Sequence, residues 1–100
     1  MKTVLVRYRT TPERAEENAA LIRVVFAELR ALAPKNLRYA SYRLADGVTF
    51  VHIATVEEVG ENPLVSLSAF KAFQKDLKSR CVEQPVLSEL SAIDSYDPNS

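Results

Sequence analysis

The chain has 100 residues, a length that supports one hydrophobic core, and we expect a single domain over residues 1–100. Thirteen basic and thirteen acidic residues cancel, so the net charge gives no reason to expect a nucleic acid or an anionic membrane as partner. The lone Cys81 excludes an internal disulfide, no apolar run reaches transmembrane length, and the amino terminus turns charged too early for a signal peptide. We therefore expect a cytoplasmic protein.

The first third of the chain predicts a strand followed by a long helix. Residues 2–9 alternate, with Val4, Val6 and Tyr8 on one face of the strand. Residues 10–13 have the composition of a helix start, with a threonine cap and a proline at the first helical position. Apolar residues then recur at helical spacing, at Ala15, Ala19, Ile22, Phe26, Leu29 and Ala33.

A β-hairpin is predicted next, with strands at 37–45 and 47–56 joined by a tight Asp46-Gly47 turn. The second strand is the strongest strand signal in the chain, since it alternates β-branched and aromatic residues and lacks proline. The turn fixes the register, which pairs Arg43 with Phe50, Ser41 with His52 and Tyr39 with Ala54. One face then carries Tyr39, Ser41, Arg43, Phe50 and His52, and the other carries Ala40, Tyr42, Leu44, Thr49, Val51 and Ile53.

The last part of the chain predicts a loop, a second helix and a fourth strand. The polar loop, which we extend over 57–66, is a candidate lid for a pocket. The second helix is expected to run to about Cys81, and Pro85 is expected to open a strand from Val86 to about Ile93. A polar tail follows from about residue 95. The apolar stripe of the second helix is Leu67, Phe70, Phe73, Leu77 and Cys81.

This element order, strand-helix-strand-strand-helix-strand, is typical of ferredoxin-like α+β folds. Right-handed crossovers give a four-stranded antiparallel sheet in the order 4-1-3-2, with both helices on one face. We expect Val4, Val6, Val51, Ile53 and Leu44 beneath the helices, and an open face of Leu5, Leu37, Tyr39, Val48, Phe50, Ala54 and Val56. A second copy would cover that apolar face, which predicts a homodimer packed sheet to sheet as a barrel.

The element order, the Thr11-Pro12-Glu13 helix start, the strand 49–53 and the segment 67–73 together resemble the dimeric α+β barrel superfamily, particularly its antibiotic-biosynthesis-monooxygenase-like domains. The resemblance implies a homodimer that oxidises, or moves a proton on, a small phenolic or other organic substrate without a cofactor. Haem-degrading members use an asparagine on the first strand and a histidine on the second helix. This chain lacks that asparagine and has Gln74 one turn after Phe70, so neither haem nor another cofactor is expected. The alternative is a non-catalytic module that binds a small ligand or another protein.

His52 is the candidate catalytic residue, because imidazole titrates near neutral pH without help. The hairpin register places it beside Ser41, Tyr39 and Arg43, and Arg7 would join them if its strand presents the same face. Such a group could bind an anionic or phenolic ligand, with arginine holding the charge and histidine moving a proton. The competing interpretation is a buried, hydrogen-bonded histidine with a structural role.

Other candidate groups lead to weaker hypotheses. Tyr8 and Tyr42 are expected on the helix side, where their hydroxyls would line a pocket or be satisfied within the core. Cys81 is expected to be structural. A strand histidine with loop acids does not give convergent ligands, so no metal site is expected.

Single-stranded RNA recognition uses the same topology, and the segment 46–53 partly matches its strand motif. Asp46 replaces a basic residue of the motif and Val48 replaces a stacking aromatic, while Leu5 stands where the first strand would supply another. We therefore expect no nucleic-acid partner.

Overall fold

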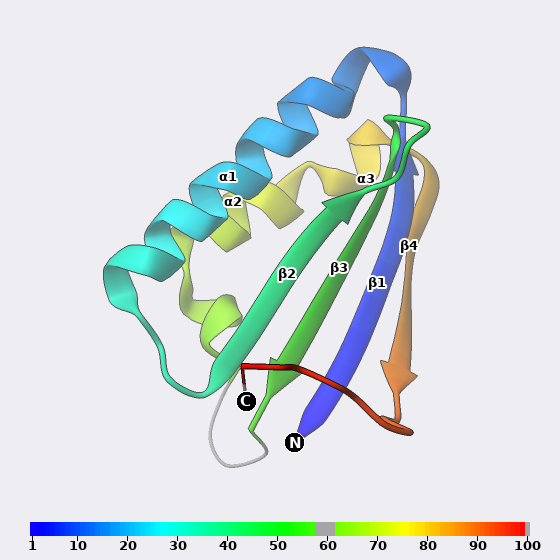
Figure 1. Ribbon diagram of the computed structural model, residues 1–100. Coiled ribbons are helices and arrows are strands. Elements are labelled where there is room, and N and C mark those ends of the chain that lie inside the picture. Colours follow the sequence, from blue (N-terminus) through cyan, green and yellow to red (C-terminus); the bar gives the residue numbers. More distant parts are fainter. Residues whose placement is uncertain (58–61, 100) are drawn as a thin grey trace.

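The computed structural model describes residues 1–57 and 62–99. In chain order the elements are β1 (Lys2–Thr10), η1 (Pro12–Arg14), α1 (Ala15–Leu32), β2 (Leu37–Arg43), β3 (Thr49–Val56), η2 (Pro63–Ser66), α2 (Ser68–Lys75), α3 (Leu77–Arg80) and β4 (Cys81–Leu90). The sheet has the order β2-β3-β1-β4, its pairs are antiparallel, and α1 and α2 lie on one side of it (Figure 1). The predicted ferredoxin-like α+β fold is confirmed.

Helix α1 follows a single 3-10 turn that begins at Pro12. Its buried side chains are three small apolar residues and one polar residue, Ala15, Ala19, Val25 and Asn18. The helix ends at Ala33, which adopts a left-handed conformation (φ 47°) and donates its backbone N–H to the Leu29 carbonyl at 2.7 Å. Within the described residues, no helix is long and apolar enough to cross a membrane.

The β2-β3 hairpin has the predicted register, with Arg43 opposite Phe50, Ser41 opposite His52 and Tyr39 opposite Ala54. Its turn is wider than two residues, because the last backbone hydrogen bond runs from the Leu44 N–H to the Thr49 carbonyl. Gly47 takes up a positive φ of 79° within the turn. The Asp46 carboxylate accepts hydrogen bonds from the backbone N–H groups of Val48 and Thr49, each at 2.9 Å, and so holds the turn closed.

The second helical region is shorter than predicted. Helix α2 stops at Lys75, the chain leaves the helix at Asp76, and α3 adds one further turn. Before α2, the Asn62 side chain accepts the Leu64 N–H at 3.0 Å and caps η2. This cap lies in the candidate lid over 57–66, of which residues 58–61 lie outside the described part of the chain.

Strand β4 begins at Cys81 rather than at Val86, and it ends at Leu90 rather than near Ile93. The prediction that the second helix runs to Cys81 was wrong, because Cys81 pairs with Thr10 of β1. Pro85 consequently lies inside a strand. A proline is tolerated there since β4 is an edge strand, and its register against β1 shifts between Glu83 and Val86.

The hairpin presents to the helices the opposite face from the one predicted. Strand β1 aligns with β3 so that Val6 lies opposite His52 and Tyr8 lies opposite Phe50. Residues directly opposite share a face of the sheet, so the His52 face of the hairpin joins the Tyr8 face of β1. The prediction that Val51, Ile53 and Leu44 lie beneath the helices was therefore wrong, as was the placement of Leu37, Tyr39, Val48, Phe50, Ala54 and Val56 on the open face.

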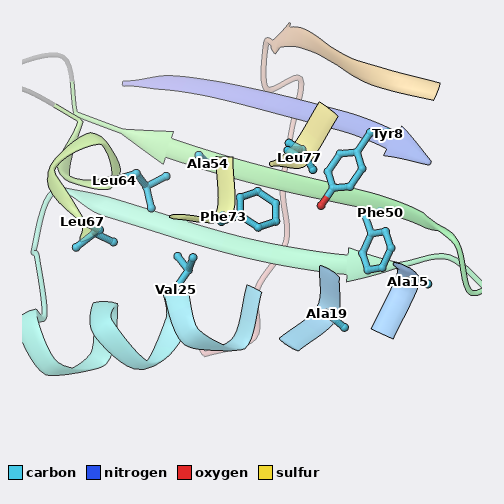
Figure 2. Packing of buried hydrophobic residues seen from close by; sticks show 10 residues of the cluster. All are labelled: Tyr8, Ala15, Ala19, Val25, Phe50, Ala54, Leu64, Leu67, Phe73 and Leu77. Atoms are coloured by element: carbon cyan, nitrogen blue, oxygen red, sulfur yellow. The ribbon is translucent and has the colours of Figure 1, made fainter. Parts of the chain in front are cut away.

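The core lies between this face and the helices (Figure 2). Tyr8 and Phe50 stack with ring centroids 5.6 Å apart, and Val25 of α1 and Phe73 of α2 belong to the same buried cluster. No helix of the described residues lies on the opposite face of the sheet, which is also apolar but, apart from Leu5, carries other residues than those predicted. We call it the open face; its apolar residues are Leu5, Ala40, Tyr42, Val51, Ile53, Val86 and Leu90.

Candidate active site

A cavity of about 470 Å³, here called the pocket, lies between the sheet and the segment formed by η2, α2 and α3. This volume is in the range of small-molecule sites. Most of its lining is apolar, including Phe70, Phe73 and Leu77. The polar lining residues are Tyr8, Tyr39, His52, Asn62, Gln74 and Lys78. The pocket can therefore enclose an apolar ligand and offer it a few hydrogen-bonding groups.

His52 is buried at the sheet side of the pocket, with 5% of its surface exposed, and both of its ring nitrogens are hydrogen-bonded. Nε2 lies 2.7 Å from the Tyr8 hydroxyl, and Nδ1 lies 2.6 Å from the Ser41 hydroxyl and 3.0 Å from the Tyr39 hydroxyl. The imidazole also stacks between the two tyrosine rings, with centroids 5.3 and 5.9 Å away. The predicted cluster of His52, Ser41 and Tyr39 is thus present.

Two buried residues that the sequence analysis missed extend this cluster. Asn18 of α1 donates its Nδ2 to the Tyr8 hydroxyl oxygen at 2.8 Å. Arg80 donates its Nε to Asn18 Oδ1 at 2.9 Å and its Nη2 to the Phe73 carbonyl at 2.8 Å. Both residues occupy positions on the apolar stripes of their helical segments, with Arg80 three residues after Leu77. This spacing is the feature of the sequence that could have predicted their burial.

Burial keeps these groups uncharged, apart from the arginine. It lowers the pKa of His52 to about 4, so the imidazole is neutral at pH 7. Burial likewise raises the pKa of Tyr8 well above its usual value and that of Tyr39 to about 12. Arg80 is 1% exposed, and among the described residues no carboxylate pairs with it. The site therefore holds a neutral histidine between phenols that keep their protons.

A second hollow of about 480 Å³, here called the groove, runs between α1 and β2. Ser41 and Tyr39 line it, as do Arg23, Arg30 and Arg43. The Arg43 Nη1 donates to the Glu16 Oε1 at 2.7 Å, and its guanidinium lies 5.3 Å from the centre of the Phe50 ring. The predicted residue Arg43 thus faces the groove, on the same face of the sheet as His52.

Two predicted ligand-binding residues lie away from the pocket. Arg7 lies opposite Val51 on the open face, so it cannot join His52. Tyr42 is on the same open face and is 57% exposed, whereas it was expected on the helix side. Tyr8, expected on the helix side, is there.

The remaining alternatives receive no support from the site. Within residues 1–57 and 62–99, no group of three metal-ligating side chains comes together. Burial raises the pKa of the Cys81 thiol, which disfavours a reactive thiolate. Phe50, the aromatic that partly matched an RNA-binding motif, is buried beneath the helices and presents no surface for base stacking.

No protein-family model and no curated protein sequence matches the chain. Solved structures do match it over most of its length. Rv0793 from Mycobacterium tuberculosis aligns with a TM-score of 0.75 and 16% identity, covering 96% of this chain and 98% of its own. An antibiotic biosynthesis monooxygenase aligns with a TM-score of 0.72 and 17% identity, covering 94% and 100%. A candidate antibiotic biosynthesis monooxygenase from Caulobacter crescentus gives 0.72 and 21%, covering 93% and 90%.

The chain has the antibiotic biosynthesis monooxygenase-like fold. The resemblance inferred from the sequence is thereby confirmed at the level of the fold. Identities of 13 to 21% among the matching structures show a shared architecture and do not transfer a substrate. The function of the domain therefore depends on the chemistry of its own pocket.

Proposed function

We propose that this domain is a homodimeric, cofactor-independent enzyme that deprotonates or oxidises a small phenolic or other organic substrate in the pocket. The observation that carries the proposal is the neutral His52–Tyr8 pair on the wall of an otherwise apolar cavity. An apolar cavity suits an aromatic ring, and a hydroxyl placed beside the pair has a route for its proton. The resulting phenolate is rich in electrons and can reduce dioxygen.

The proposal assigns roles to three side chains. Tyr8 meets the substrate hydroxyl, because Tyr8 is one of the residues that line the pocket and its hydroxyl proton can pass to His52 Nε2. His52 accepts that proton while it is neutral at pH 7. Tyr39 borders both the pocket and the groove, and its hydroxyl is hydrogen-bonded to His52 Nδ1, the ring nitrogen away from Tyr8. The groove supplies Arg43 for an anionic substituent.

The test uses 1-naphthol and dioxygen. Oxidation consumes one dioxygen per naphthol and yields 1,4-naphthoquinone and water, so an oxygen electrode and the quinone absorbance give two readouts of one reaction. We expect turnover by the wild type and its loss in Tyr8→Phe and in His52→Ala, with the fold intact by circular dichroism. The matched control is Tyr96→Phe, which removes the hydroxyl of a tyrosine that is 89% exposed and lines neither the pocket nor the groove. Full activity in both pocket variants would contradict the proposal.

A non-catalytic binding module is the second candidate, and one observation favours it. Both His52 nitrogens are already hydrogen-bonded within the protein, as expected for a structural histidine. Binding of 1-naphthol without oxygen consumption or quinone would support the module. Binding can be followed by calorimetry with the same three variants.

We further propose that the open face is covered by a second copy. It carries seven apolar side chains, including Leu5, Ile53 and the exposed Tyr42, and each Å² buried contributes about 25 cal/mol before the cost of association. Sedimentation equilibrium should give a dimer for the wild type and a monomer for Ile53→Glu. Val24→Glu, on the exposed side of α1, should remain dimeric. A monomeric wild type would overturn this part of the proposal. The cytoplasmic location remains a prediction from the single Cys81.

A further inference from the structure

We propose that Asn18 and Arg80 are positioning residues that fix the direction of the hydrogen bonds through Tyr8 and His52, from the pocket toward the groove. The inference deepens the proposed function, because it states where a proton released in the pocket would go. Its structural part stands without any substrate. Each step follows from which atoms can donate and which can accept.

The direction begins at Arg80, because a guanidinium has five N–H donors and no acceptor. Its Nε points at Asn18, so the amide atom that faces it must be the oxygen, Oδ1. The other amide atom, Nδ2, then faces Tyr8 and is a donor. Arg80 is itself held by its second hydrogen bond, to the Phe73 carbonyl, and by the Phe73 ring 5.2 Å from its guanidinium. The Asn18 amide, which could otherwise flip its oxygen and nitrogen, is thereby held in one orientation.

The Tyr8 hydroxyl receives this constraint. Its oxygen accepts the Asn18 hydrogen, so its own hydrogen must find an acceptor elsewhere. The acceptor within 2.7 Å is His52 Nε2. Tyr8 is therefore the donor and Nε2 carries no hydrogen.

His52 passes the direction on. A neutral imidazole has one N–H, and with Nε2 as acceptor that hydrogen lies on Nδ1. Nδ1 then donates to the Ser41 hydroxyl at 2.6 Å, with Tyr39 at 3.0 Å as a second acceptor. Ser41 lines the groove, where its own hydrogen can be given to water. Within residues 1–57 and 62–99, the hydrogen-bond partners of the imidazole are these two hydroxyls and that of Tyr8, and the edge of the Phe73 ring also packs against it.

A substrate proton can travel along this chain without leaving a charge on the relaying side chains; the negative charge stays on the substrate oxygen in the pocket, and the proton leaves on water in the groove. The substrate O–H bond breaks as its proton moves to the Tyr8 oxygen, and the Tyr8 proton moves to His52 Nε2. The Nδ1 proton moves to Ser41, and the Ser41 proton moves to water in the groove. Tyr8, His52 and Ser41 all end neutral, with the imidazole proton now on Nε2. The reverse movement returns a proton to the pocket and restores the first tautomer.

The test is the tautomer of His52, read from two-bond ¹H–¹⁵N spectra of the ¹⁵N-labelled protein at pH 7. The wild type should show a protonated Nδ1 and an unprotonated Nε2. Asn18→Asp replaces the donor with an acceptor of the same shape, and Arg80 beside it keeps the new carboxylate ionised. Tyr8 would then donate to that carboxylate and accept from His52, so the proton should move to Nε2.

Matched variants separate direction from simple folding. Arg80→Lys retains only donors and should keep the wild-type tautomer, while Asn36→Asp adds the same charge five residues before Ser41 and should also leave it unchanged. A wild-type tautomer protonated at Nε2 overturns the inference, and that measurement needs no variant to fold. An Asn18→Asp protein that keeps the proton on Nδ1 overturns it as well. Failure of the proposed oxidation would appear in the oxygen assay and would leave these spectra unchanged.

Discussion

Acidification should destabilise the folded protein through His52. Burial lowers the pKa of this imidazole from 6.5 to about 4, so between these values the unfolded chain binds a proton that the folded state excludes. The unfolded state binds more protons there, and the free energy of unfolding falls as the pH falls. The full effect is about 3 kcal/mol below pH 4, of which about 2 kcal/mol is already lost between pH 7 and pH 5.

Urea denaturation of the wild type and of His52→Gln, at one protein concentration, measures this loss. Glutamine offers one acceptor and one donor to the hydroxyls around it but binds no proton. Hydrogen bonds lower the pKa of Glu16 and of Asp46, and both groups titrate alike in the two proteins. We expect the wild type to lose about 2 kcal/mol more than the variant between pH 7 and pH 5. Equal losses would refute the conclusion that burial holds His52 neutral.

Three further predictions concern stability, and each has an internal comparison. Tyr8→Phe leaves His52 Nε2 and the Asn18 amide without a partner and should cost about 1–3 kcal/mol, against less than about 0.5 kcal/mol for the exposed Tyr96→Phe, by chemical denaturation. Asp46→Ala removes the acceptor that closes the hairpin turn and should lower the unfolding free energy by about 1–2 kcal/mol; an unchanged midpoint would contradict this role. Ala33→Gly relieves the positive φ at the helix C-cap and should stabilise the protein by about 0.5–1 kcal/mol, whereas Ala31→Gly inside the helix should destabilise it by about the same amount. The two thermal midpoints should therefore move in opposite directions.

The sequence sufficed for the parts of the fold that depend on local pattern. Alternation and the Asp46-Gly47 turn determined the hairpin, and that register alone put Ser41 and Tyr39 beside His52. A hairpin's pairing follows from the chain between its strands, so counting from the turn was enough.

The sequence could not determine which face of the hairpin the helices cover. That choice depends on the register between β1 and β3, which are separated by a helix and another strand, and a shift by one residue inverts every side chain. The error moved Arg7 into the candidate site and placed Tyr42 beneath the helices. Alternation within a strand shows which residues share a face, but it does not show which face of one strand aligns with which face of the other.

The polar core was missed for a related reason. Asn18 and Arg80 are 62 residues apart and satisfy each other only after the helices dock on the sheet. Each alone is an isolated polar residue on an apolar stripe, a feature that is more often explained by exposure to solvent. The break at Asp76 was missed because the apolar spacing continues through it to Leu77.

The position of a bound phenol tests the central claim most directly. Intermolecular NOEs can be measured between 1-naphthol and the ¹³C-labelled protein. We predict contacts with the side chains that line the pocket, above all Tyr8, Phe70 and Leu77. Contacts confined to Ile22 and Phe26 in the groove would contradict the assignment of the pocket as the binding site, as would the absence of any contact at saturating ligand.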